Sequence, residues 1–222
     1  MKVLIVYAHE NPASFNGAMK DLAVEVLTGQ GHEVQVSDLY AQGFNPVAGK
    51  HDFTELSGAE FYKYQAEQVA AGERGTFAAD VRAEMDKLLW ADLVIFQFPM
   101  WWFHLPAILK GWMDRVLASG FAYGNGQMFD RGKLAGKRAI CAITTGGPAA
   151  FYPDLAESLK PIMFGILYFT GMQVLPPFGA HAPVQADDAT RAGMLAAYRE
   201  RLEQLAATEP VKYPTMAEMG MG

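Results

Sequence analysis

Apolar runs alternate along this chain with segments in which apolar positions recur every three or four residues. The longest apolar runs cover residues 2–7, 93–98 and 137–143. Because these runs contain almost no polar alternation, they predict strands that are buried on both faces, as in a parallel sheet. Residues 172–175 predict a further short strand, and residues 33–39, which alternate polar and apolar, predict an outer strand.

The segments between these strands have the spacing of helices that bury one face. The helices are expected to begin at Asn16, after Thr76, at Leu105, at Leu155 and at Asp187. The helix over residues 155–169 is apolar almost throughout, which a subunit interface would explain. Strands that alternate with helices predict an α/β fold with a doubly wound, five-stranded parallel sheet in the order 2-1-3-4-5.

The regular pattern is interrupted over residues 40–75, which are rich in Pro, Gly, His and aromatic residues. A segment of this length without clear periodicity is typical of a functional loop or of a loop that lies over a partner. Both interpretations stay open at this stage. We expect one domain over residues 1–208, followed by a loosely held tail over residues 209–222.

Composition restricts the classes of partner and compartment. The chain has 222 residues, with 18 Lys and Arg against 24 Asp and Glu, and it contains no basic run, which argues against nucleic acid and anionic membranes as partners. The single cysteine, Cys141, lies in a predicted strand and excludes a disulfide framework. The N-terminal apolar run is too short for a secretion signal and no stretch is long enough to span a membrane. We expect a cytoplasmic protein.

An aromatic loop, Met100-Trp101-Trp102-Phe103, follows the central strand directly. In an open parallel sheet, ligands bind outside the carboxyl ends of the strands, where the strand order reverses. The loop is therefore either a platform for a planar cofactor or substrate, or a hydrophobic cap over the core or a subunit interface. His104, at the end of this loop, either faces the pocket or points to solvent.

Two further loops are expected at the same edge of the sheet, over residues 9–16 and 144–152. The first contains no G-x-G-x-x-G and no Walker pattern, which argues against a classical dinucleotide fold and against phosphoryl transfer. Ser14, Phe15 and Asn16 stand at the start of a helix, where unpaired N–H groups favour an anion such as a phosphate. Plain capping by Ser14 or Asn16 is the alternative.

The second loop contains Thr144-Thr145-Gly146-Gly147, which combines hydroxyl donors with two glycines that allow a ligand to approach the backbone. Such a loop suits the polar edge of a heteroaromatic ring, and the aromatic loop would supply an apolar wall opposite it. A flavin needs this combination of surfaces. The histidines show no metal-ligand spacing, and we predict no metal.

Several motifs resemble the NAD(P)H:quinone oxidoreductases of the DT-diaphorase type, which have a flavodoxin-like fold. The motifs are IFQFP at residues 95–99, WF at 102–103, PAILKGW at 106–112, FAY at 121–123 and ITTGG at 143–147. The resemblance implies a homodimer with FAD, rather than FMN, at the interface. It also implies two-electron hydride transfer from NAD(P)H through the flavin to a quinone.

The resemblance also implies roles for individual residues. His9, Ser14, Phe15 and Asn16 would hold the pyrophosphate side of the cofactor, and Pro99, Met100, Trp102, Phe103, Thr144, Thr145, Gly146, Gly147 and Tyr152 would surround the isoalloxazine. Tyr152 would be the catalytic residue, because its hydroxyl could stabilise the charge of the reduced flavin. Tyr123 and Phe169 would line the substrate pocket, partly from the other subunit. Trp101 stands where the resemblance gives no aromatic residue, and we expect it to influence which acceptor is reduced.

The sequence departs from the family pattern in two places. The family pairs the tyrosine matched by Tyr152 with a histidine shortly after it, whereas residues 152–165 contain no histidine. A water or a group that the resemblance does not identify would then take the place of the imidazole. The chain also lacks the C-terminal extension of the animal enzymes, so a preference for NADH or NADPH is not inherited.

Three other functions are compatible with the same fold. They are an azo- or nitroreductase, a redox-regulatory subunit of another protein, and a flavodoxin-like electron carrier without a substrate of its own. The aromatic residues around the predicted pocket argue against the carrier, because they suit a closed substrate site better than an exposed flavin edge.

Overall fold

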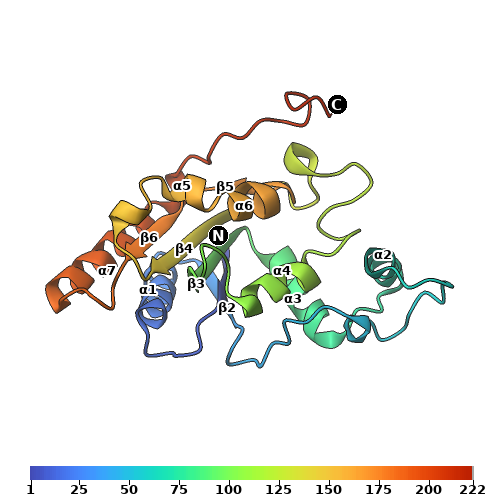
Figure 1. The fold of residues 1–222 in the computed structure, drawn as a ribbon, viewed down its shortest axis with the longest axis horizontal. Helices are drawn as coiled ribbons and strands as arrows, with labels where there is room; N and C mark the ends of the chain where they lie inside the picture. Colours follow the sequence, from blue (N-terminus) through green and yellow to red (C-terminus); the bar gives the residue numbers. More distant parts are fainter. Residues whose placement is uncertain (222) are drawn as a thin grey trace.

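A parallel sheet lies between two layers of helices in the computed structural model, which describes residues 1–221 (Figure 1). The strands β1 (Lys2–Tyr7), β3 (Leu93–Pro99) and β4 (Arg138–Thr145) form its centre, and β2 (Glu33–Asp38) forms one edge. The order is β2-β1-β3-β4-β5, and every pairing is parallel. The predicted doubly wound parallel sheet is confirmed: β3 is buried along its whole length, and β1 and β4 are buried from their second residue onward, as their apolar sequences require.

The far edge of the sheet differs from the prediction of five strands. It consists of two short strands, β5 (Gln173–Val174) and β6 (Phe178–His181), which pair with successive parts of β4. The sequence Pro176-Pro177 separates them, and proline interrupts a strand because it has no N–H for the ladder. The sheet therefore has six strands, and β6 brings His181 opposite Thr145 at the carboxyl end of β4.

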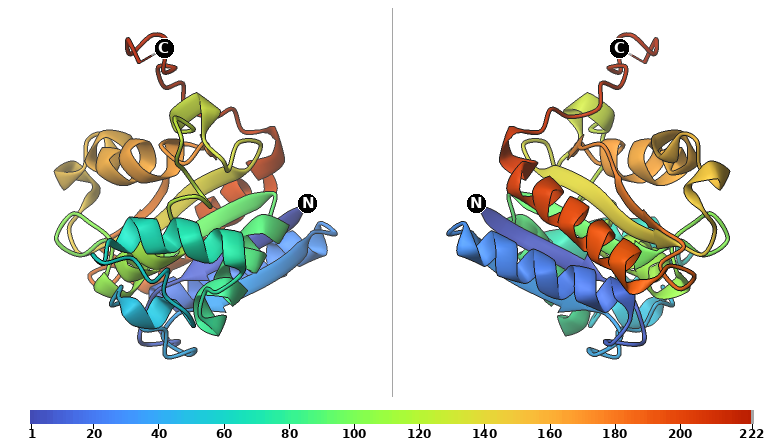
Figure 2. Two further views of the ribbon diagram at one scale, coloured as in Figure 1. Left: turned by 90° about the vertical axis from the view of Figure 1, so that its right-hand side faces the viewer. Right: turned by 90° about the vertical axis from the view of Figure 1, so that its left-hand side faces the viewer.

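The helices divide between the two faces of the sheet. On one face, α1 (Phe15–Gly29) and α7 (Asp188–Glu203) lie side by side, as the right-hand view of Figure 2 shows. The other face is covered by α3 (Ala79–Trp90) and α4 (Ala107–Val116), together with residues 155–168. Alternate side chains of β1 point to the two faces, so each face has its own hydrophobic core.

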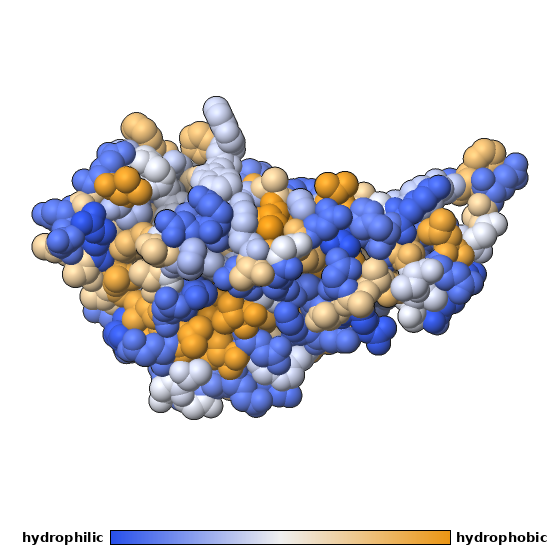
Figure 3. All heavy atoms as spheres, turned by 90° about the horizontal axis from the view of Figure 1, so that it is seen from below, coloured by the Kyte–Doolittle hydropathy of each residue, from blue (hydrophilic) through white to orange (hydrophobic). Residues whose placement is uncertain are grey.

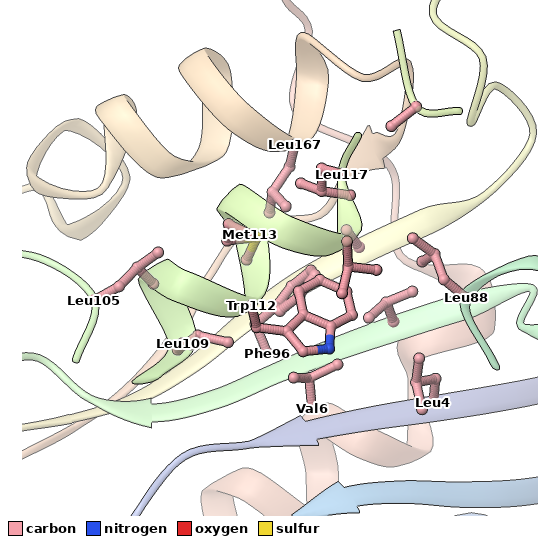
Figure 4. Packing of buried hydrophobic residues seen from close by; sticks show 14 of the residues in the cluster. Leu4, Val6, Leu88, Phe96, Leu105, Leu109, Trp112, Met113, Leu117 and Leu167 are labelled. Atoms are coloured by element: carbon pink, nitrogen blue, oxygen red, sulfur yellow. The ribbon is translucent and has the colours of Figure 1, made fainter. Parts of the chain in front are cut away.

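Trp112 of α4 is fully buried in the core that α3 and α4 cover (Figure 4). Its ring meets Phe96 of β3 edge-on, with ring centroids 5.8 Å apart. Its indole N–H donates a 2.8 Å hydrogen bond to the carboxylate of Glu84, which also pairs with Lys87 at 2.7 Å. The polar atoms that Trp112 and Glu84 bring into the core are therefore satisfied.

The single helix predicted over residues 155–169 is broken into three pieces. These are α5 (Leu155–Ser158), α6 (Lys160–Ile162) and a π-helical segment, η4 (Met163–Tyr168). Pro161 lies at the break, where its ring and missing N–H are incompatible with a continuous α-helix. Apolar periodicity predicts which face is buried, but it does not reveal this change of helix type.

Residues 40–75 contain a short 3₁₀ helix, η1 (Lys50–Asp52), and an 11-residue α-helix, α2 (Tyr64–Arg74). Arg115 of α4 anchors this segment from the core. Its buried guanidinium contacts the carboxylates of Asp52 at 2.7 Å and Asp80 at 2.8 Å, and it donates to the carbonyl of Asn45 at 2.7 Å. The segment over residues 40–75 is therefore held to the rest of the fold by the buried Arg115 guanidinium, whose charge is paired with carboxylates.

Further 3₁₀ turns occur at η2 (Phe129–Arg131), η3 (Ala149–Phe151) and η5 (Leu205–Ala207). Beyond η5 the chain extends away from the helices (Figure 1). The amide of Val211 donates to the carbonyl of Val174 at 2.8 Å, and Met216 is buried. The domain boundary at residue 208 stays a prediction, and Gly222, at the end of the predicted tail, lies outside the described residues.

The surface mixes polar and apolar side chains. In the space-filling view of one face, an apolar patch is surrounded by hydrophilic residues (Figure 3). Over residues 1–221, none of the helices combines the length and the hydrophobicity that a membrane span requires.

Candidate active site

Three loops meet at the carboxyl ends of β1, β3 and β4. The side-chain amide of Asn16 donates a 2.5 Å hydrogen bond to the hydroxyl of Thr144, and the amide of Met100 donates to the carbonyl of the same threonine at 2.8 Å. The rings of Phe103 and Tyr152 lie 5.8 Å apart. The three loops that the sequence places at one edge of the sheet therefore meet within one chain, and we call the space that they border the crevice.

A buried polar chain supports the floor of this crevice. Tyr198 of α7 donates to the amide oxygen of Gln97 at 3.2 Å, and the nitrogen of Gln97 donates to the amide oxygen of Asn16 at 2.7 Å. Asn16, which is only 2% exposed, donates in turn to the hydroxyl of Thr144 and so extends this chain of hydrogen bonds. Since buried amides must have partners, this chain fixes which way Asn16 points and holds α1 against β4.

The loop after β1 leaves donors free at the start of α1. Ser14 is the helix cap, and its hydroxyl accepts from the amide of Gly17 at 3.1 Å, so the capping alternative holds for this residue. Within residues 1–221, the amides of Phe15 and Asn16 have no acceptor. His9 accepts from the amide of Asn11 at 3.0 Å through Nδ1, which leaves Nε2 for a ligand. These donors suit an anionic group.

The aromatic loop is a strained two-residue turn. Trp101 and His104 exchange backbone hydrogen bonds of 3.1 and 2.9 Å, and the residues between them, Trp102 and Phe103, have φ of 52° and 57°. Asn-Gly is the usual sequence for such a turn, because side chains at positive φ cost about 1–3 kcal/mol each. Trp102 is nevertheless 97% exposed and Phe103 62%. Strain and exposed aromatic surface at one position are typical of a ligand-binding site.

The residues before Trp102 differ in how much of their side chains is exposed. Pro99 ends β3, and Met100 is buried in the core under α3 and α4, so its side chain does not form an open wall. Trp101 is 42% exposed. The exposed apolar surface of this loop therefore comes from Trp101, Trp102 and Phe103.

The loop after β4 presents its backbone to the crevice. A Cβ atom on Gly146 would meet nothing within 4 Å, so this residue borders open space. A Cβ atom on Gly147 would lie 2.6 Å from the Phe151 ring, so glycine is required there by packing within the chain. The hydroxyl of Thr145 contacts the carbonyl of Gly147 at 2.7 Å and holds the turn.

Tyr152 contacts two aromatic rings. It packs against Phe103 and against His181, and the Tyr152 and His181 rings are nearly parallel at 18° with centroids 5.6 Å apart. His181 is the residue that sequence reasoning missed, because it lies on the strand hidden behind Pro176-Pro177. Burial lowers the pKa of the His181 imidazole below its usual value.

Tyr123 and Phe169 do not reach this crevice. Their rings lie 5.3 Å apart and, together with Gln65, they line a separate cavity of about 420 Å³. Gln65 donates to the Tyr123 hydroxyl at 3.0 Å. None of residues 99–103 or 144–152 lines that cavity. One chain therefore contains two parts of the predicted site that are not joined.

The three loops fit a flat heteroaromatic cofactor with an anionic extension. Unpaired amides at residues 15 and 16 suit phosphate, the open space at Gly146 suits a ring edge, and exposed aromatic rings suit its face. The described residues contain no group of three or more His, Cys, Asp or Glu side chains arranged to hold a metal ion.

The chain is similar over nearly its whole length to proteins of known family. The family model for the flavodoxin-like fold matches residues 1–202. Ribosyldihydronicotinamide dehydrogenase (quinone) of Pongo abelii is 47% identical, with 95% of this chain and 94% of the relative covered. NAD(P)H dehydrogenase (quinone) 1 of Rattus norvegicus is 42% identical, with 96% of this chain and 80% of the relative covered.

Solved structures show the same likeness. A Klebsiella pneumoniae protein, described as a candidate quinone reductase, superimposes with a TM-score of 0.92 at 42% identity, covering 97% of this chain and 89% of that one. General stress protein 14 of Treponema denticola, solved in complex with FMN, has a TM-score of 0.64 at 27% identity, covering 93% of this chain and 99% of that one.

Proposed function

This chain belongs to the family with the flavodoxin-like fold, and we propose that it is an NAD(P)H dehydrogenase that reduces quinones through a bound flavin. The curated relatives that match nearly its whole length are quinone-linked dehydrogenases. The structural observation that carries the proposal is the strained, exposed Trp102-Phe103 turn, which packs through Phe103 against Tyr152 of the loop after β4.

The bound flavin would supply the redox chemistry by accepting hydride and passing it on. The residues of this chain bind and orient it. Trp102 and Phe103 would cover one region of the ring and exclude water from it, and the backbone of Gly146 and Gly147 would bind its polar edge. Tyr152 packs against Phe103, and from there its hydroxyl would donate to a ring that gains negative charge on reduction.

We assign FAD rather than FMN as the flavin. His9, Ser14, Phe15 and Asn16 surround the start of α1 and provide donors for a pyrophosphate. FMN is the alternative, because general stress protein 14 of Treponema denticola was solved in complex with FMN. Heat release of the flavin followed by chromatography and mass measurement distinguishes the two, and recovery of FMN alone would overturn the assignment.

A homodimer would join the two separated parts of the site. Tyr123 and Phe169 line a cavity away from the flavin loops, so a second copy could bring this cavity over the crevice of the first. A mixed dimer of a Trp102→Ala subunit and a Phe169→Ala subunit tests this arrangement. It retains one intact composite site, so we expect it to recover about half the activity that both parent variants lack. A monomer by sedimentation, or no recovery, contradicts it.

The central experiment is anaerobic reduction followed by reoxidation. NADH or NADPH should bleach the visible absorption of the flavin, and a quinone should restore it. A colourless protein that takes up neither FAD nor FMN would overturn the proposed function. A flavin that neither nucleotide reduces would instead identify an electron carrier, and reoxidation by azo or nitro compounds but not by quinones would identify the azo- or nitroreductase alternative.

A further inference from the structure

His181 is joined to the flavin loops by two independent contacts. It ends β6, in register with Thr145 at the end of β4, and its Nδ1 lies 3.0 Å from the Thr145 hydroxyl. Its ring also stacks on Tyr152. A Cβ atom on Gly179 would lie 3.0 Å from His181 Nε2, so the small residue two positions earlier leaves room for the imidazole.

The hydrogen bonds determine which nitrogen of His181 carries the proton. The Thr145 hydroxyl lies 2.7 Å from the carbonyl of Gly147 as well as 3.0 Å from His181 Nδ1. A hydroxyl has one proton and a carbonyl can only accept, so both contacts are satisfied when Thr145 donates to Gly147 and His181 Nδ1–H donates to Thr145. In this tautomer Nε2 is unprotonated. The ring can therefore gain a proton at Nε2 while both hydrogen bonds of Thr145 remain in place.

The surroundings of His181 are uncharged. From the loop after β4 it faces Tyr152, Thr145, Pro148 and Ala149, and from the segment leading into α7 it shares a cavity with residues 182, 185, 186, 190 and 194. Over the described chain, no carboxylate lies within 4.0 Å of its ring nitrogens. At the start of α7, Arg191 pairs with Asp188 and donates to the carbonyls of Pro183 and Ala186.

We propose that His181 is a positioning residue of the flavin site, holding the Thr145–Gly147 turn by hydrogen bonding and the Tyr152 ring by stacking. This inference rests on the proposed function. The Tyr152 hydroxyl lies over Gly147, 3.5 Å from where a Cβ atom on that glycine would be. His181 therefore fixes a donor and a carbonyl on the same side of the crevice.

The placement has an electrostatic consequence. Hydride transfer brings two electrons and one proton to the flavin, so the reduced ring carries one more negative charge than the oxidised ring. A proton taken up at His181 Nε2 places a positive charge behind Tyr152, in surroundings where no carboxylate neutralises it. Reduction of the flavin and protonation of His181 should therefore favour each other. The imidazole comes from β6, which is not where the family resemblance places one.

His181→Phe tests the inference, because phenylalanine keeps the stacking partner of Tyr152 but removes the hydrogen bond and the proton site. The flavin midpoint potential of the wild type should bend with pH at the pKa of His181. In the variant this bend should disappear, and below that pKa the ratio of reduced to oxidised flavin at a fixed potential should fall by about tenfold, which is roughly 30 mV for two electrons. His32→Phe, at a half-buried histidine beside the N-terminus, is the control and should match the wild type.

A second measurement does not depend on flavin chemistry. Nitrogen chemical shifts of the imidazole in the flavin-free protein should report the Nδ1–H tautomer, and Thr145→Val should remove the preference. An Nε2–H tautomer in the wild type, or potentials in His181→Phe that follow the wild type at every pH, overturns the inference. A protein that binds no flavin but shows the expected tautomer would overturn the proposed function and leave only the positioning contact.

Discussion

The side-chain amide of Asn16 donates a 2.5 Å hydrogen bond to the hydroxyl of Thr144, 128 positions further along the chain. This bond links the loop after β1 to the loop after β4, directly beneath the crevice. It also ends a buried chain of polar groups that begins at Tyr198 and passes through Gln97. Loss of Asn16 should therefore affect both stability and cofactor binding.

Asn16→Ala leaves the buried amide of Gln97 and the hydroxyl of Thr144 without this partner. We expect a loss of about 1–3 kcal/mol in the free energy of unfolding, the usual cost of unsatisfied buried groups. Urea denaturation measures the stability, and fluorescence titration of the flavin measures its dissociation constant, which should rise. Gln30→Ala, which removes an exposed 3.4 Å contact, is the control and should change stability by less than about 0.5 kcal/mol. Equal effects in the two variants would contradict the role of the network.

Trp102→Gly separates a binding role for the aromatic loop from a capping role. Glycine relieves the strain at a φ of 52°, worth about 1–3 kcal/mol, and costs roughly 0.5–1 kcal/mol in backbone entropy. We expect unchanged or higher thermal stability together with weaker flavin binding. Phe61→Gly removes another exposed aromatic ring, outside the three loops, and should leave flavin affinity unchanged. A destabilised Trp102→Gly protein with normal flavin affinity would show that the loop is a hydrophobic cap.

Gly111→Ala tests how closely the 40–75 segment crosses α4. A Cβ atom at this position would lie 2.1 Å from the carbonyl oxygen of Pro46, so the backbone must move. We expect destabilisation of about 1–3 kcal/mol, as for other overpacked sites. Gly193→Ala is the matched control, because this α7 residue has nothing within 4 Å and should gain about 0.5–1 kcal/mol. Calorimetry of both variants gives the comparison, and a stable Gly111→Ala protein would contradict the close crossing.

Cys141 should be unreactive in the folded protein. Burial raises the pKa of its thiol to about 12, whereas the thiol of an unfolded chain titrates near about 8.5. The stability contributed by this group is thus complete below the unfolded value and falls as the pH rises from about 8.5 towards 12, because only the unfolded chain releases the proton. Iodoacetamide at pH 9 should add mass only in denaturant, and rapid labelling of the native protein would show that the thiol is accessible.

Local sequence patterns determine most of the secondary structure and the location of the crevice. Buried strands require uninterrupted apolar residues, and the loops that follow them must meet at one edge of a parallel sheet. The glycines and aromatic residues of these loops therefore predict a cofactor site from the sequence alone. Pro161 and Pro176-Pro177 were visible in the sequence too, but apolar periodicity alone did not predict a broken helix or a divided edge strand.

Other features were decided only by tertiary structure, because they depend on register and on the direction of side chains. The pairing of β6 with β4 places His181 beside Thr145 and Tyr152, and no spacing along the chain predicts that contact. Met100 is buried whereas Trp102, two positions later and at a positive φ, is exposed, although both have large side chains. The sequence by itself determined which residue types reach the crevice edge, whereas the fold decided which side chains face a ligand, since burial and hydrogen bonding are set by contacts between distant segments.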